Sequence, residues 1–127
     1  MGHRGGRRAD SRVRRSEVWL TDLEPIRGSE ANKRRPAVLV SNDQANRRAD
    51  ELGRGVVTVV PVTSSVARVL PFQVLLPAGE CGLSVPSKAQ AEQVRSVDVS
   101  RLVTRLGRVP PSLVTELDAA LRLHLSL

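Results

Sequence analysis

Short apolar runs rich in β-branched residues alternate with polar, turn-forming segments along most of the chain. Runs of this length, bounded by Gly, Pro and polar clusters, are typical of strands. They predict strands at residues 17–23, 36–40, 56–62, 72–76, 87–97 and 103–109. The polar residues 41–55 predict a connection with one helical turn near 42–46, and residues 98–101 predict a tight turn. We therefore expect a chain built mainly from short strands.

The strongest of these strand predictions contains a proline. The run over residues 56–62 is β-branched at nearly every position, but Pro61 has no amide hydrogen to donate to a neighbouring strand. Proline inside a sheet is confined to edge strands, strand starts and bulges. The sequence therefore predicts an edge or a bulge at Pro61.

The hydrophobic period changes after residue 109. Leucines recur at helical spacing from residue 113 to residue 125, directly after two prolines and Ser112. Proline is tolerated at a helix start and Ser112 is a suitable N-cap, so we expect a C-terminal helix that begins there. Many short strands followed by one amphipathic helix favour a mainly β fold, a small β-barrel with a packed C-terminal α-helix.

The net charge of +7 is concentrated at the N-terminus. Residues 1–16 hold six arginines against one aspartate, a charge of +5, which leaves +2 for the other 111 residues. This arginine- and glycine-rich stretch has no apolar periodicity, so it predicts a disordered basic tail over residues 1–16. The remaining length fits one domain, which we expect to span residues 17–127.

The composition excludes several classes of site. Trp19 and Phe72 are the only large aromatic residues, which excludes a broad stacking platform for nucleic-acid bases. Cys81 is the only cysteine and the two histidines lie far apart, so we expect no disulfide, no bound metal and no cofactor. No apolar run approaches the length that spans a membrane, and none follows the basic stretch as in a secretory signal. We therefore expect a cytoplasmic protein without a membrane partner.

Four segments, taken in order, carry a family resemblance. Residues 17–23 (EVWLTDL) form an opening strand, and residues 28–43 (GSEANKRRPAVLVSND) form a loop and a second strand. Residues 59–64 (VVPVTS) form a strand that ends in threonine, and residues 92–98 (EQVRSVD) form a later segment. In order and spacing they resemble the MazF/PemK family of toxins over about residues 17–126. The basic extension before residue 17 departs from the family pattern.

The resemblance implies a homodimeric SH3-like β-barrel of the CcdB/PemK type. It implies the toxin component of a type II toxin–antitoxin system: a growth-inhibiting, sequence-selective, metal-independent endoribonuclease (RNA interferase) that cleaves single-stranded RNA. It also implies a MazE-like antitoxin whose acidic, flexible segment wraps the dimer. Two catalytic positions of the family carry over to this sequence, Arg35 directly before Pro36, and Thr63.

These two residues suit cleavage of RNA by its own 2′-OH. Attack on the adjacent phosphate gains from intramolecular proximity and leaves 2′,3′-cyclic phosphate and 5′-OH ends. The Arg35 guanidinium can bond two phosphate oxygens, and Thr63 can add a hydroxyl donor. A two-histidine mechanism does not fit the positions of His3 and His124, so the general base stays unassigned. Candidate contacts to the RNA are Ser29, Glu30, Arg34, Ser64 and Gln93.

Each assignment has a simpler alternative. Arg35 could be a solvated surface arginine, and Thr63 a strand-end hydroxyl that bonds the backbone. Gln93 fits a structural hydrogen bond as well as a base contact, and Trp19 fits the core better than a stacking surface. Two other functions stay open on the same fold, a DNA gyrase poison resembling CcdB and a catalytically inactive RNA-binding module. The pairing of Arg35 with Thr63 favours the nuclease.

Overall fold

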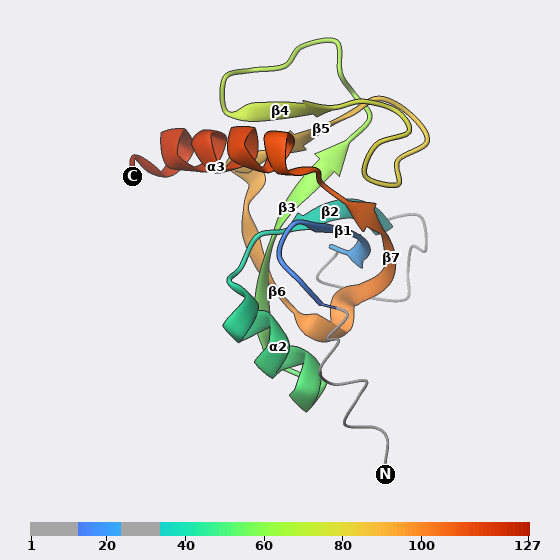
Figure 1. Ribbon diagram of the computed structural model, residues 1–127, viewed down its shortest axis with the longest axis vertical. Coiled ribbons are helices and arrows are strands. Elements are labelled where there is room, and N and C mark those ends of the chain that lie inside the picture. The colour runs from blue at the N-terminus through green and yellow to red at the C-terminus, as the bar shows by residue number, and fades with distance from the viewer. Residues whose placement is uncertain (1–12, 24–33) are drawn as a thin grey trace.

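The computed structural model describes residues 13–23 and 34–127 and consists of short strands with one long helix at the C-terminus (Figure 1). The strands are β1 (Glu17–Asp22), β2 (Arg34–Leu39), β3 (Val56–Thr63), β4 (Gln73–Leu76), β5 (Ser87–Gln90), β6 (Arg95–Asp98) and β7 (Leu102–Arg108). The helices are α2 (Asp43–Leu52) and α3 (Pro111–Leu125), with short 3-10 helices η2 (Ala91–Gln93) and η3 (Val99–Arg101). No helix in the described ranges is long and apolar enough to cross a membrane. The predicted fold class, mainly β with a C-terminal helix, is confirmed.

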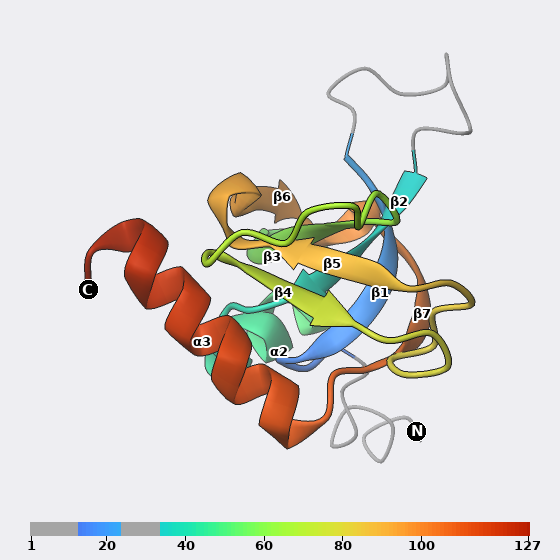
Figure 2. The same ribbon diagram turned by 90° about the horizontal axis from the view of Figure 1, so that it is seen from above.

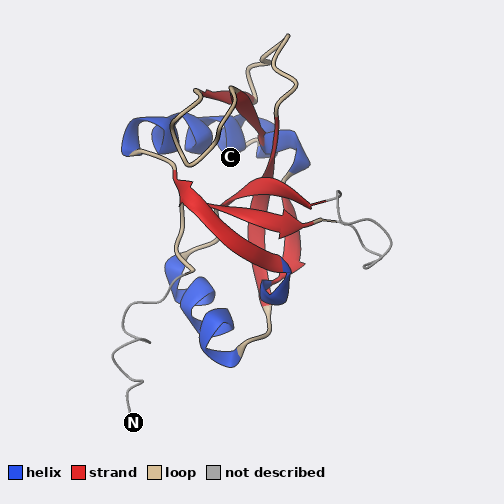
Figure 3. Cartoon of the chain, turned by 90° about the vertical axis from the view of Figure 1, so that its right-hand side faces the viewer, coloured by secondary structure: helices blue, strands red, loops and turns tan. Residues whose placement is uncertain are grey.

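The strands form one curved antiparallel sheet in the order β4-β5-β3-β2-β1-β7, and β6 pairs with the first half of β3. Figure 3 shows the strands crossing at steep angles rather than lying in a flat layer. β4 and β7 stand at the two ends of this order, and within the described ranges no pairing joins them. The expected barrel is therefore an open, curved sheet.

β3 is a central strand, and its proline lies in a break between two ladders. β6 pairs with residues 56–59 and β5 pairs with residues 62 and 63, so one edge of β3 has no ladder partner between them. The backbone amide and carbonyl of Thr58 both bond on the β2 side. Because successive residues point to alternate sides, Pro61 faces the break, where its missing hydrogen costs no ladder bond. The expected irregularity is present, but in a central strand rather than at an edge.

Apolar side chains pack against both faces of this sheet. Val62 of β3 joins a cluster that includes Leu117 of α3, and Figure 2 shows α3 lying along β4 on that side. Val59, which points to the opposite face, joins a second cluster with Trp19. The prediction that Trp19 belongs to the core is confirmed, since the residue is buried.

α2 is longer than the single turn that the sequence predicted. Asn42 caps its first turn, where Oδ1 accepts from the amide of Ala45 at 2.8 Å, and Gly53 ends it with a φ of 70°. Only Asn46 and Ala49 are buried along the helix. An amide and a methyl group give no leucine-like stripe, so the apolar pattern did not predict the helix.

Two other predicted boundaries are wrong. The single strand expected over residues 87–97 is divided by η2 into β5 and β6, because the chain pairs first with the end of β3 and then with its start. α3 has Pro110 rather than Ser112 at its N-cap, and two amides of the first turn donate to the Pro110 carbonyl. The bond from the Val114 amide is the ordinary first bond of the helix, and no side chain caps this end.

The described chain begins before β1, inside the segment expected to be tail. Val13 is buried, and the amide of Ser16 donates to the carbonyl of Leu39 at 2.7 Å. The Arg15 guanidinium reaches Asp118 of α3 at 2.8 Å. The chain is therefore packed onto the sheet from residue 13, four residues before the expected boundary, whereas the rest of the expected tail, residues 1–12, lies outside the described residues.

Candidate active site

Two polar residues come together where β2 begins and β3 ends. The β2–β3 ladder ends where Ala37 faces Pro61, and two residues beyond that pair come Arg35 and Thr63, which line one pocket. On the other side of β2, Thr21 of β1 faces Arg35. The sheet thus brings both residues expected to be catalytic to one end of the strands.

A pocket of about 400 Å³ opens at this end of the sheet. Its lining residues are Arg35, Pro36, Val62, Thr63, Ser64, Gly82, Leu83, Ser84, Val85, Ser87 and Leu106. Strand residues supply part of the lining, and the loop between β4 and β5 supplies most of the rest. One guanidinium, several hydroxyls and an apolar floor suit an anionic group attached to a flat, partly apolar base.

The β4–β5 loop is held against β7 by a backbone-to-backbone contact. A Cβ on Gly82 would overlap the carbonyl of Leu106, and a Cβ on Gly107 would overlap the backbone of Cys81. Gly82 also has a φ of 79°, a region that side-chain-bearing residues rarely adopt. Figure 2 shows the loop passing beside β7. Glycine at both positions therefore allows residues 82–85 to form a wall of the pocket.

Cys81 lies in the same loop but is not an activated nucleophile. Its side chain is buried, and burial together with the nearby Glu80 carboxylate raises the pKa of the thiol. A raised pKa leaves less thiolate at neutral pH.

Three of the predicted site residues line the pocket together. Thr63 is half-buried, and its Oγ1 accepts from the amide of Ser65 at 3.2 Å. Arg35 and Ser64 are exposed and border the same space. A cation and two hydroxyls therefore surround one pocket although they come from two different strands and a loop.

The other predicted site residues lie elsewhere. Arg34 is exposed at the start of β2 and Gln93 is exposed on η2, and neither lines the pocket. Ser29 and Glu30 lie outside the described residues. The wall formed by residues 82–85 was not predicted from the sequence, because it depends on the approach of the loop to β7. The one available signal was the pair of distant glycines.

Among the described residues, the pocket lining contains no carboxylate and no imidazole. The same ranges hold no group of three or more His, Cys, Asp or Glu side chains that could bind a metal ion. His124 lies on α3 near Phe72, with 6.5 Å between the ring centroids, and does not line the pocket. The positive charge in the described lining is that of Arg35.

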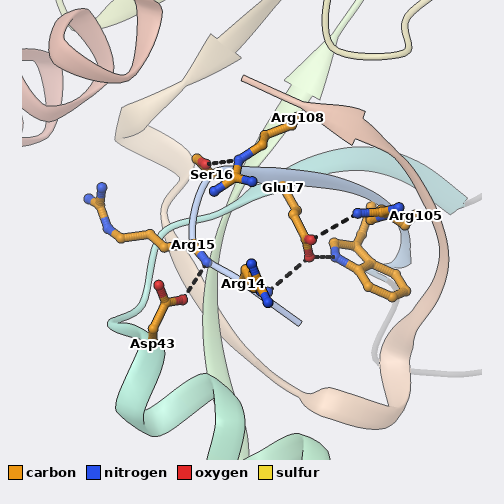
Figure 4. Close-up of polar contacts among 8 residues, drawn as sticks. Arg14, Arg15, Ser16, Glu17, Asp43, Arg105 and Arg108 are labelled. Carbon is orange, nitrogen blue, oxygen red and sulfur yellow. Dashed lines mark hydrogen bonds and ion pairs between the residues drawn. The ribbon is translucent and has the colours of Figure 1, made fainter. Parts of the chain in front are cut away.

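Glu17 is the one fully buried carboxylate among the described residues, and it holds the fold together (Figure 4). Its Oε1 accepts from the Arg14 amide at 2.9 Å and from Trp19 Nε1 at 3.1 Å. Its Oε2 accepts from the Arg105 guanidinium at 3.2 Å. These bonds join the N-terminal segment, β1 and β7, so Glu17 is a structural carboxylate rather than a candidate general base.

Known proteins resemble this chain in both sequence and fold. A family model of PemK-like, MazF-like toxins of type II toxin–antitoxin systems matches residues 14–125. The chain belongs to this family. Endoribonuclease MazF9 of Mycobacterium tuberculosis is 60% identical over 115 residues, which cover 91% of this chain and 98% of that protein. The resemblance identified in the sequence is confirmed.

Solved structures of MazF proteins have the same arrangement of strands and helices. MazF from Deinococcus radiodurans is 29% identical, with a TM-score of 0.69 over 91% of this chain and 98% of that chain. A mycobacterial endoribonuclease, solved in complex with its cognate antitoxin, has a TM-score of 0.71 at 24% identity. That match covers 90% of this chain and 95% of the other. The open, curved sheet with its C-terminal helix is therefore the MazF fold.

Proposed function

We propose that this MazF-family toxin is a sequence-selective endoribonuclease that cleaves single-stranded RNA without a metal ion. The observation that carries the proposal is the single pocket lined by Arg35, Thr63 and Ser64. The family, and the endoribonuclease named among its relatives, support the class of activity. A gyrase poison or an inactive RNA-binding module would not require a guanidinium and a hydroxyl in one pocket, so the same observation favours the nuclease.

The pocket suits transfer of a phosphate from the 5′-oxygen to the neighbouring 2′-oxygen. The 2′-OH loses its proton to a base and attacks phosphorus, and the bond to the 5′-oxygen breaks as that oxygen gains a proton. The products are a 2′,3′-cyclic phosphate and a 5′-OH. Negative charge grows on the non-bridging oxygens during attack, so donors placed around the phosphate lower the barrier.

Arg35 and Thr63 supply such donors. A guanidinium donates two parallel hydrogen bonds to a phosphate, and Arg35 is exposed at the edge of the pocket, where RNA reaches it. Thr63 Oγ1 accepts from the Ser65 amide, which leaves its own hydrogen free to donate toward the phosphate. Arg35 also suits proton donation to the leaving 5′-oxygen. In this scheme the positive charge that stabilises the phosphate is that of Arg35.

Residues around the phosphate site would select the sequence. Ser84, on the loop wall, and Ser64 offer hydroxyls to base edges, and Leu83 offers an apolar surface. Arg34, directly before Arg35, would contact the RNA backbone outside the pocket. We retain Ser29 and Glu30 as contacts from the β1–β2 connection, and Gln93 as a contact beyond the pocket.

The proposed partners follow from the family. A type II toxin is paired with an antitoxin, so we propose a MazE-like partner with an acidic, flexible segment that complements the +7 charge of this chain. We further propose that the toxin acts as a homodimer and in the cytoplasm, where cellular RNA is accessible.

An oligonucleotide with one altered sugar tests the mechanism. We expect no cleavage when the 2′-OH at the scissile nucleotide is replaced by hydrogen, because the nucleophile is then missing. The same replacement at a nucleotide outside the recognised sequence is the control, and it should leave the rate unchanged. Normal cutting of the first oligonucleotide would contradict attack by the 2′-OH.

A further inference from the structure

Lys88 of β5 is a buried lysine in the strand next to Thr63. The β3–β5 ladder sets Lys88 directly opposite Thr63, and the β4–β5 ladder sets it opposite Leu75. Directly opposed residues project from the same face of a sheet. Lys88 therefore shares a face with a residue of the proposed active site, although it does not line the pocket.

The loop over residues 64–71 covers Lys88. Leu75, its neighbour on the same face, is 46% exposed, whereas Lys88 is only 9% exposed, so the cover is local. The Lys88 ammonium donates to the carbonyl of Arg68 in this loop at 2.6 Å, and among the described residues no carboxylate pairs with it. Burial of an ammonium is unfavourable unless it is hydrogen-bonded. The hydrogen bond to the Arg68 carbonyl therefore offsets part of the cost of burying the Lys88 ammonium.

Two further contacts hold the ends of the same loop. At its start the Ser65 amide donates to Thr63 Oγ1, and at its end the Leu70 amide donates to Gln73 Oε1 at 2.9 Å. Gln73 is itself buried, and its Nε2 donates to a carboxylate of η2 at 2.8 Å. Figure 2 shows the loop running from β3 past β5 to β4. The 64–71 loop begins in the pocket at Ser64, and Lys88 of β5 holds its middle through the bond to Arg68.

We propose that Lys88 is a positioning residue for RNA binding, which clamps the 64–71 loop so that the Arg68 guanidinium contacts a phosphate beside the scissile one. The clamp holds the Arg68 carbonyl, and the Arg68 residue is exposed, so its side chain can extend toward the RNA. A loop fixed in advance loses less conformational freedom on binding. The inference rests on the proposed function, because its ligand is single-stranded RNA.

The test is a double-mutant cycle on binding rather than on cleavage. The probe is a uniformly 2′-O-methylated single-stranded RNA, which has no 2′-OH and cannot be cut, and its affinity is measured by fluorescence anisotropy. For a single strand, each phosphate contact contributes a slope of about 0.7 to the fall of log affinity with log salt concentration. Between about 1 M and about 0.15 M salt, this slope corresponds to roughly a fourfold change in affinity per contact. We expect Arg68→Ala and Lys88→Met each to lose this factor, and the double variant to lose no more.

Two variants serve as controls. Lys88→Arg keeps a charged donor and should restore most of the affinity. Arg122→Met removes an exposed charge from α3, outside the pocket lining, and should leave affinity within about twofold of wild type, because exposed charges away from the bound strand are screened by salt. Hydrogen exchange at residues 66–69 should be faster in Lys88→Met. If Lys88→Met does not fold, Lys88→Gln replaces it, because its shorter side chain does not reach the Arg68 carbonyl.

The outcomes separate this inference from the proposed function. A roughly sixteenfold loss in the double variant would mean that the two residues act independently, and it would overturn the clamp. Unchanged affinity in Lys88→Met would overturn it as well. Wild-type protein that binds the methylated RNA but cuts no ordinary RNA would refute the endoribonuclease and leave the clamp decided by its binding data. A wild-type chain that binds no RNA would refute both.

Discussion

The wall of the pocket depends on Gly82. Its backbone conformation and its close contact with β7 each require a glycine. At Gly82, φ is 79°, and a Cβ would overlap the backbone carbonyl of Leu106, which cannot turn aside as a side chain can. Gly79, in the same loop, has a φ of 86°, but nothing lies within 4 Å of a Cβ added there. Replacing each glycine by alanine therefore separates the cost of the backbone conformation from the cost of the overlap.

The magnitudes follow from these two positions. The left-handed conformation costs a residue with a side chain about 1–2 kcal/mol, and this is the whole loss expected for Gly79→Ala. Overlap in a closely packed place adds about 1–3 kcal/mol, so Gly82→Ala should lose roughly 2–5 kcal/mol of unfolding free energy. The expected difference of about 1–3 kcal/mol is the contribution of the close approach between the loop and β7.

Urea unfolding at one fixed protein concentration measures both losses. Cleavage by protein that remains folded should fall further in Gly82→Ala than in Gly79→Ala, because the overlap moves the residues 82–85 that line the pocket. Equal losses of stability in the two variants would refute the argument that the loop is fixed by contact with β7. Equal cleavage rates would refute the role of the wall.

The remaining predictions concern Glu17 with its arginine partner, Cys81 and Arg35. Glu17→Ala removes the acceptor of three buried or partly buried donors and should lose about 3–5 kcal/mol of unfolding free energy in urea. Arg105→Ala leaves the buried Glu17 carboxylate without its counter-charge and should also lose more than about 1 kcal/mol. Arg108→Ala, which removes an exposed guanidinium bonded to Ser16, is the control and should lose about 1 kcal/mol or less. Cys81 should react with iodoacetamide much more slowly in the folded than in the unfolded chain, since burial and Glu80 raise the pKa of its thiol. Because the unfolded chain then releases the thiol proton first, stability should fall as the pH rises through the ordinary thiol range. Arg35→Lys should lose at least about tenfold in cleavage rate, because a point charge does not reproduce two parallel hydrogen bonds.

Each of these expectations has a contrary result. Similar stability losses from Glu17→Ala and Arg108→Ala would show that an exposed guanidinium matters as much as the buried carboxylate. Alkylation of folded Cys81 at the rate of the unfolded chain would show an accessible, reactive thiol. A near-wild-type rate in Arg35→Lys would show that the geometry of the guanidinium is irrelevant to catalysis.

Local sequence pattern was enough to predict most strands. The β-branched run over residues 56–62 is β3, and the segments at residues 17–23 and 36–40 are β1 and β2 to within two residues. The division of residues 87–97 by η2 was not predictable in this way. It arises because β5 and β6 share one edge of β3, and a pairing of that kind involves segments far apart in the sequence.

The candidate site was only partly visible in the sequence. Arg35 and Thr63 were identified through the family resemblance, and the register of β2 with β3 explains why they lie together. The wall formed by residues 82–85 and the clamp at Lys88 were missed, because both depend on how loops fold back onto strands. A lysine followed by alanine and glutamine carries no local sign that its ammonium will be buried under a loop.

The central claim is that the pocket around Arg35 cleaves RNA without a metal ion. Its most direct test is incubation of the purified, antitoxin-free protein with a long single-stranded RNA in EDTA, beside an Arg35→Ala control. We expect discrete fragments that end in 2′,3′-cyclic phosphate with the wild-type protein, and a rate about 10²–10³-fold lower in the control, as for loss of a transition-state donor. Intact RNA in the presence of folded wild-type protein, or equal cutting by Arg35→Ala, would contradict the account.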